Sequence, residues 1–444
     1  MRFIAAAALA AAAGAAVSAP STAQVGTPAA PMVGTPVTSS PVRAPAGPPA
    51  PAILPAVAPR AGPLPADLTL TQALEEAAAR SPAVVAAEAE VRAAEARLRQ
   101  AGYRTNPELS LEVENVAGTG ELRGINRMET TLAVNQRLDI SGRRSARIEA
   151  ARAALALQRL RLSIARADLA QSVREQFARA IAARQRLDQA EDNLTWAREL
   201  ARVASVLVDA GRDPPLRAIR ARSALAQADA AHEAAAAEEL AARSSLAALF
   251  GAGTPITRVS GPLLDARSGT IAPETSLEVR LADAEREDAQ AELRQQRAER
   301  RLDPAVGLGV RHVRETGDVG LVGGISMPLR IFDRNQGNIG AAEQGVAAAE
   351  ARRANALATT TARARNAIVT VEGAQRRVAA LEKAAIPEAS EALRLTQRSY
   401  EEGRATLLEL LDARNAFVAA ERDLTEARLA LALAAAELAR ISAQ

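Results

Sequence analysis

The chain has 444 residues, with 55 Lys and Arg against 52 Asp and Glu for a formal net charge of +3, and it contains no Cys. The absence of Cys excludes disulfides, thiol catalysis and Cys-based metal sites, and two His are too few for an imidazole metal cage. Acids and bases are interspersed and only 2% of residues are aromatic. This composition argues against nucleic-acid binding, which uses a basic stripe and stacking aromatics.

The N-terminus has the pattern of an export signal. Arg2 precedes an Ala-rich apolar stretch over Phe3–Val17, and small residues follow at Ser21-Thr22-Ala23. We therefore predict a secretory signal peptide over residues 1–23 and an exported bacterial protein. Residues 24–66 are predicted to form a disordered linker, because 13 of the 23 prolines lie between Pro20 and Pro65.

The rest of the chain contains two copies of one unit. Asn106-Pro107 aligns with Asp303-Pro304, residues 134–147 align with residues 325–338, and Gly211 aligns with Gly403. Such self-similarity indicates duplicated supersecondary units. We predict a first repeat over 67–250, an inter-repeat linker over 251–274 and a second repeat over 275–444.

Each repeat has the same predicted order of elements. A helix rich in Ala, Glu and Arg comes first, with Asp67 or Thr69 as the candidate cap in the first copy and Thr275 or Ser276 in the second. A β-hairpin follows, then a helix of sixty-odd residues that would be roughly 90–100 Å long, a Gly-containing turn and a shorter returning helix. The predicted helices span residues 70–101, 145–208, 216–250, 277–302, 339–400 and 407–441.

The four predicted strands alternate apolar and polar side chains. Leu109, Leu111 and Val113 share one face of the first strand, and Val306, Leu308 and Val310 share one face of the third. Four strands cannot close a barrel alone, and a bilayer admits no open sheet edge. Strands from several chains could form the wall of an outer-membrane barrel; the alternative is a small soluble sheet that caps a helical bundle.

Two motifs resemble a known family. The first copy has Asn106-Pro107-Glu108 and Gly142-Arg143-Arg144, as in TolC-like outer-membrane efflux proteins. The run PLRIFDRNQGNI over Pro328–Ile339 is similar to the cobalt–zinc–cadmium resistance branch of that family. The resemblance covers nearly all of the mature chain.

The resemblance implies a mainly α fold with a small β part. Duplicated coiled-coil hairpins would form a periplasmic tunnel, and four strands per chain would contribute to a twelve-stranded outer-membrane β-barrel in a homotrimer. The partners would be a periplasmic adaptor protein, an inner-membrane resistance–nodulation–division pump and outer-membrane lipid. The duct would conduct substrates passively, so no catalytic, cofactor-binding or metal-binding residue is expected and the chain would not be an enzyme.

The resemblance also suggests a periplasmic aperture at the hairpin tips. Tyr400 and Gly403 mark the second turn, and Glu409 and Asp412 follow on one face of the next helix. A ring of these carboxylates from three chains would favour cations; the alternative is two solvated surface acids. The matching residues of the first hairpin are Arg217 and Arg220, which could form salt bridges to the second hairpin.

The leading functional hypothesis is an exit duct of a tripartite efflux complex, most simply for divalent heavy-metal cations. A duct for drug efflux or type I protein secretion would have the same fold. A periplasmic coiled-coil adaptor is a weaker alternative, because an adaptor has one coiled hairpin rather than two. An exported enzyme would need a convergent set of catalytic side chains, and the sequence offers none.

Overall fold

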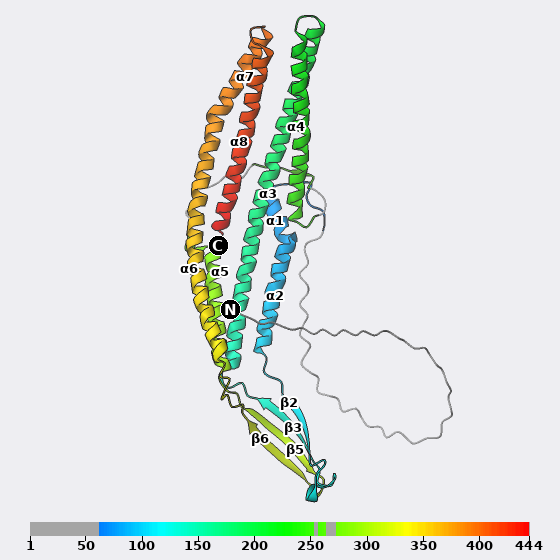
Figure 1. The fold of residues 1–444 in the computed structure, drawn as a ribbon, viewed down its shortest axis with the longest axis vertical. Coiled ribbons are helices and arrows are strands. Elements are labelled where there is room, and N and C mark those ends of the chain that lie inside the picture. Colours follow the sequence, from blue (N-terminus) through cyan, green and yellow to red (C-terminus); the bar gives the residue numbers. More distant parts are fainter. Residues whose placement is uncertain (1–61, 253–255, 263–271, 444) are drawn as a thin grey trace, which may run out of the picture. The chain divides into compact units, whose positions relative to one another are not determined.

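The computed structural model describes residues 62–443 except 253–255 and 263–271, all within one unit that spans Pro55–Gln444 (Figure 1). The predicted signal peptide, residues 24–61 of the predicted linker and part of the inter-repeat linker lie outside the described residues. The helices are α1 (Leu70–Arg80), α2 (Pro82–Gly102), α3 (Arg143–Asp209), α4 (Pro215–Ala248), α5 (Leu277–Glu299), α6 (Gln336–Ala380), α7 (Ile386–Glu401) and α8 (Leu407–Ile441). The strands are β1 (Asp67–Leu68), β2 (Glu108–Glu114), β3 (Glu129–Arg137), β4 (Arg258–Val259), β5 (Ala305–Val313) and β6 (Val319–Ser326).

The first predicted helix is divided in two. Thr69 caps α1 in a capping box with Gln72, so one of the two predicted caps is confirmed. The helix then stops at Ser81, whose ψ of 122° is not helical, and Pro82 begins α2. A single helix over 70–101 was wrong because the residue before a proline is driven away from helical geometry. In the second repeat, Ser276 caps α5 through the backbone N–H of Val279.

Two long helical arms dominate the fold. Helix α3 has 67 residues, which corresponds to about 100 Å, and α4 returns along it. Helices α6 and α7 form the second arm, and α8 returns along them; α3 also packs against α2, α5 and α8. Many of the buried residues on these helices are Ala, among them Ala183, Ala204, Ala221 and Ala436, and such small side chains let helix axes approach closely. Within the described ranges, no helix is both long and apolar enough to cross a membrane.

The second arm contains a π-helical turn. Residues 381–385 join α6 to α7, and the N–H of Ile386 bonds to the carbonyl of Leu381, five residues earlier. Pro387 follows at once; a proline inside a helix removes a backbone donor and its ring clashes with the preceding turn. The wider π turn relieves this clash, so the helical path continues through the proline.

Four strands form an antiparallel sheet in the order β2-β3-β5-β6. The register places Leu111 opposite Leu132, Leu132 opposite Val310, and Val310 opposite Leu321. The apolar side chains therefore form one continuous row across the sheet. Strands β2 and β6 are its two outer edges.

A smaller ladder was not predicted from the sequence. Strand β1, just before α1, pairs in parallel with β4 in the segment between the repeats. Its Leu68 is fully buried with Val173 and Phe177 of α3 and Leu246 of α4. This core fixes the start of the first repeat against the middle of α3.

Candidate functional site

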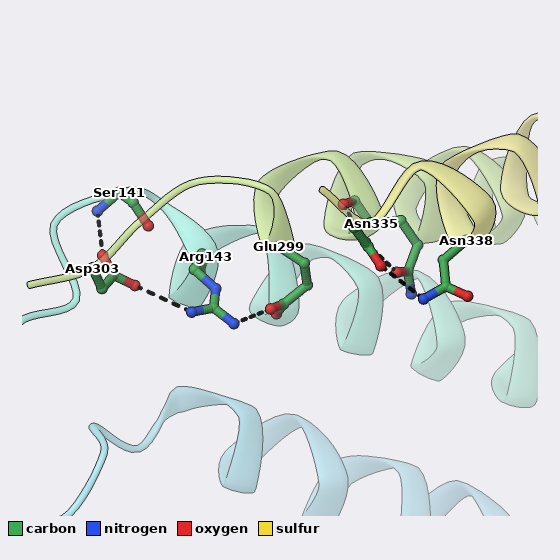
Figure 2. Close-up of polar contacts among 7 residues, drawn as sticks. Ser141, Arg143, Glu299, Asp303, Asn335 and Asn338 are labelled. Atoms are coloured by element: carbon green, nitrogen blue, oxygen red, sulfur yellow. Dashed lines mark hydrogen bonds and ion pairs between the residues drawn. The ribbon is translucent and has the colours of Figure 1, made fainter. Parts of the chain in front are cut away.

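The junction between sheet and helices is held by a buried carboxylate. The Asp303 side chain is 2% exposed, and its Oδ1 accepts from the backbone N–H groups of Ile140 at 3.2 Å and Ser141 at 2.9 Å. Arg143 lies 3.9 Å from the other Asp303 oxygen and pairs with Glu299 (Figure 2). Residues from the two repeats are thereby joined where β3 leads into α3.

The apolar face of the sheet is exposed in the single chain. Leu109, Leu308 and Leu321 are 71%, 76% and 92% exposed. Soluble proteins rarely expose an apolar patch of this extent, and such a patch marks an interaction surface or a membrane contact. The face thus has the character of a surface that meets lipid.

The opposite face of the sheet carries polar side chains and small residues. Arg311 of β5 pairs with Glu114 at 3.2 Å and Glu129 at 2.8 Å, and its Nε donates to Thr131. A Cβ on Gly309 would lie 2.6 Å from the Cβ of Ala133, so only Gly fits there. Small residues and paired charges on this face suit contact with water.

The two hairpin tips are closed by the same backbone device. Gly211 and Gly403 have φ values of 68° and 73°, which Gly adopts without strain. In the first tip the N–H of Gly211 bonds to the carbonyl of Val208, and in the second the N–H of Gly403 bonds to that of Tyr400. Helix C-termini commonly end in this left-handed geometry, so the two predicted turns close alike.

The two tips pack against each other through an apolar cluster. Leu200 and Ala204 of α3 and Ala221 of α4 contact Leu407 and Leu410 of α8. All five are buried. The tip of the first hairpin is therefore held against the tip of the second within one chain.

The predicted aperture acids lie on the surface of the second tip. Glu409 is exposed and closes a capping box with Thr406, whose backbone N–H and hydroxyl bond to its carboxylate at 2.6 and 2.9 Å. These bonds hold the pKa of the Glu409 carboxyl below its ordinary value. Asp412 is exposed on the same helix. One of the two acids thus also determines where α8 begins.

Arg217 is bound within its own hairpin. Its Nη1 lies 2.5 Å from Asp213, four residues earlier. The hydroxyl of Tyr400 and the Oδ2 of Asp213 are buried, and neither has a hydrogen-bond partner among the described residues. Burial first, and then the Asp213 carboxylate, raises the pKa of Tyr400, while Arg217 opposes the rise. Asp213 and Arg217 of the first hairpin therefore both interact electrostatically with Tyr400 of the second hairpin.

Arg220 lines a cavity between the two hairpins. The cavity has a volume of about 270 Å³, and Trp196 of α3 and Leu411 of α8 also line it. Beside it, the Arg414 guanidinium lies 5.3 Å from the ring centre of Trp196 and donates to Asn193. Arg414 had no local signal in the sequence for these two contacts, since Trp196 and Asn193 are more than 200 residues away in the chain.

Glu421 lies in the same interface between α3 and α8. Burial and the nearby Asp192 raise the pKa of its carboxyl, and Arg414 opposes the rise. Within the described residues, no group of three or more His, Asp or Glu side chains is placed to hold a metal ion.

Comparison with known families identifies the chain. The family model described as "Outer membrane efflux protein" matches residues 73–252 and 271–444. The chain belongs to this family. As an outer membrane efflux protein it is located in the outer membrane, and the predicted family resemblance is confirmed.

Two curated relatives are metal-resistance proteins. The nickel-cobalt-cadmium resistance protein NccC of Alcaligenes xylosoxydans xylosoxydans is 34% identical over 63% of this chain and 64% of its own length, so the aligned region spans less than two thirds of that relative. The cobalt-zinc-cadmium resistance protein CzcC of Cupriavidus metallidurans is 30% identical over 82% of this chain and 85% of its own length.

The fold matches a solved outer-membrane protein. The crystal structure of the outer membrane protein VceC from Vibrio cholerae covers 84% of this chain and 96% of VceC, with a TM-score of 0.69 and 20% identity. At this identity the likeness shows the fold alone. The predicted fold class, long coiled helices with a small β part, is thereby confirmed.

Proposed function

We propose that this chain is the exit duct of a tripartite efflux complex and conducts divalent heavy-metal cations passively to the exterior. The observation that carries the proposal is the sheet, whose apolar and polar faces are separated and which leads into helices of about 100 Å. A barrel wall in a membrane needs this separation, with lipid outside and water inside. The helices supply the length for a periplasmic tunnel.

The duct is a homotrimer. Four strands leave the edges of β2 and β6 open, and backbone groups inside a bilayer have no water to bond. Three chains give twelve strands, and the ring has no free edge. The tunnel ends would bind a periplasmic adaptor protein and an inner-membrane resistance–nodulation–division pump. Because that pump would supply the energy, the duct needs no enzymatic activity of its own.

Divalent metals are favoured as substrates by the named relatives. NccC and CzcC are resistance proteins for nickel, cobalt, cadmium and zinc. A duct for drugs or for type I protein secretion is the second candidate, because the same fold serves in it. Residues 67–250 and 275–444 form the two repeats, so each repeat contributes one hairpin and two strands.

The aperture lies at the hairpin tips. Glu409 and Asp412 are exposed there, and three copies would form a ring of six carboxylates that favours cations. Asp213 and Arg217 of the first hairpin interact with Tyr400 of the second, so the contact between hairpins contributes to keeping the aperture closed. Arg220, at the cavity between the hairpins, is the remaining candidate for an ion pair on opening or closing.

Metal tolerance of a deletion strain tests the function. The strain is grown with nickel, cobalt, cadmium, zinc and copper, and in parallel with a dye and a detergent. Sensitivity confined to divalent metals, and restored by the intact gene, is the expected result. Sensitivity to the dye and detergent alone would move the duct to drug export, and full tolerance of every compound would contradict the efflux proposal.

Planar-bilayer recording tests the aperture. The double variant Glu409→Gln/Asp412→Asn should lose cation selectivity relative to the native channel. The matched control is Glu388→Gln/Asp423→Asn, which neutralises two exposed acids farther from the tip on the same hairpin. Equal selectivity of the two double variants would remove Glu409 and Asp412 from the conduction path.

A further inference from the structure

A pair of side chains before β5 holds both polar groups of one backbone residue. Arg301 Nη1 donates to the carbonyl of Ser141 at 2.9 Å, and Asp303 Oδ1 accepts from the Ser141 N–H at 2.9 Å. Next to them the Leu138 N–H donates to the carbonyl of Pro304. The loop from β3 to α3 is therefore clamped by the residues that lead into the neighbouring strand.

The sequence contains a second version of this clamp. Arg104-Thr105-Asn106-Pro107 precedes β2 just as Arg301-Leu302-Asp303-Pro304 precedes β5. Asn and Asp both offer an Oδ1 acceptor. The side chains of Arg104 and Asn106 are exposed. Neither forms a hydrogen bond or an ion pair with another described residue, so no described part of the single chain occupies the second clamp.

A second loop of matching geometry follows β6. In the first loop the Ile140 N–H bonds to the Leu138 carbonyl, and in the second the Ile331 N–H bonds to the Leu329 carbonyl. With these pairs superimposed, Phe332 takes the position that Ser141 has in the first loop. Phe332 is 90% exposed, and its backbone N–H has no hydrogen-bond partner among the residues described.

The sheet order determines where the second loop must dock. Within the chain, β3 and β5 pair, and the first loop meets the clamp before β5. Strand β6 is followed by the second loop and β2 is preceded by the second clamp. These two strands are the opposite edges of one four-stranded sheet, so they do not pair with each other within a single chain. The β3–β5 contact is repeated only where β6 of one copy pairs with β2 of another copy.

A cavity beside the second clamp has room for the exposed ring. Its volume is about 640 Å³, and its lining includes Gln100, Tyr103, Asn106 and Arg147. The residue that matches Phe332 in the first loop points inward, because the hydroxyl oxygen of Ser141 is buried. A Phe side chain turned the same way would leave solvent and enter this cavity, and such burial is favourable.

We propose that Arg104 and Asn106 of one chain hold the backbone of Phe332 in a second copy of this chain. The guanidinium donates to the Phe332 carbonyl, the Asn106 amide oxygen accepts from the Phe332 N–H, and the ring fills the cavity beside Tyr103. This interface between copies rests on the proposed multi-chain duct, and it names the contact that closes the ring where the sheet meets the helices.

Disulfide cross-linking tests the contact without background, because the native chain has no Cys. The variant Asn106→Cys/Phe332→Cys is expressed in the outer membrane, oxidised mildly and separated on non-reducing gels. A disulfide needs Cα atoms within about 7 Å, and the proposed contact brings the two residues as near as the hydrogen bond that joins Asp303 Oδ1 to the Ser141 nitrogen at 2.9 Å in the first clamp. The control Asn106→Cys/Val319→Cys places the second thiol at the far end of β6, where no bond is expected.

The expected result is a reducible ladder up to the closed oligomer in the test pair and monomer in the control. Assembly is followed separately by native mass spectrometry. An oligomer without the test cross-link would overturn the clamp and leave the proposed duct intact, whereas monomer alone would overturn both. A cross-link in the control as strong as in the test pair would also overturn the clamp.

Single substitutions give a second measurement if the double Cys variants fail to accumulate. Asn106→Leu removes one hydrogen bond per interface, so the oligomer should dissociate with an equilibrium constant roughly fivefold higher per interface. Asn106→Asp introduces the residue type that the first clamp has at Asp303, and this variant should assemble like the native chain. Equal dissociation of the Leu and native proteins would contradict the clamp.

Discussion

Replacing Asp303 by Ala should destabilise the chain more than any surface substitution. The carboxylate is 2% exposed and accepts two backbone N–H groups, from Ile140 and Ser141. Leaving a buried donor unpaired costs about 1–3 kcal/mol. The Ile140 N–H keeps its second acceptor, the Leu138 carbonyl, so only the Ser141 N–H is left unpaired, and the expected loss in the free energy of unfolding is about 1–3 kcal/mol. Asp303→Asn keeps an acceptor oxygen and should lose about 1 kcal/mol.

The assay is guanidinium-induced unfolding in detergent micelles, followed by circular dichroism. Asp318→Ala is the matched control, because Asp318 is exposed at the other end of the same β-hairpin, and it should remain within about 0.5 kcal/mol of the native protein. If Asp303→Ala also stays within that range, the junction does not depend on the carboxylate, and the argument from buried N–H donors is wrong.

Three further predictions concern the tip and the polar face. Burial raises the pKa of Tyr400 in the folded state, so the unfolding free energy should fall as pH rises above about 10. The fall should be smaller in Tyr400→Phe, and identical pH profiles by guanidinium unfolding would refute this. Arg311→Gln leaves Glu114 and Glu129 without their shared cation, so reversal potentials in planar bilayers should shift toward cation selectivity; an unchanged potential would place this face outside the conduction path. The pKa of Glu409 is lowered from 4.5, so its contribution to stability is present above pH 4.5 and is lost as pH falls through the lower folded value. Glu409→Gln should weaken this acid sensitivity, and equal sensitivity of both proteins would count against the capping role.

The sequence was sufficient for elements whose signals are local. The alternation of apolar and polar side chains predicted β2 and β5, in which apolar residues such as Leu109 and Leu308 occupy every second position. Gly211 and Gly403 predicted the two turns, since Gly tolerates the positive φ found there. The capping box of Glu409 also had a local signal, Thr406 followed three residues later by Glu, although the family resemblance had suggested only an aperture role.

Contacts between distant segments could not be predicted in this way. The cation–π contact of Arg414 with Trp196 joins residues 218 positions apart, and the β1–β4 ladder has only two residues in each strand. Such short strands have no periodicity to detect, and the ladder depends on burial of Leu68 against α3. Tertiary packing, rather than local preference, determines these features.

The π-helical turn at residues 381–385 has a consequence for the direction in which the side chains of α7 point. The difference in residue number between matched positions is 191 at Ile140 and Ile331 and 192 at Gly211 and Gly403. The second copy therefore contains one inserted residue between these points. In a regular α-helix an extra residue would rotate everything beyond it by about 100°. The π turn absorbs that residue locally, so the insertion was accommodated without turning the apolar face of α7 away from the tip of the first hairpin.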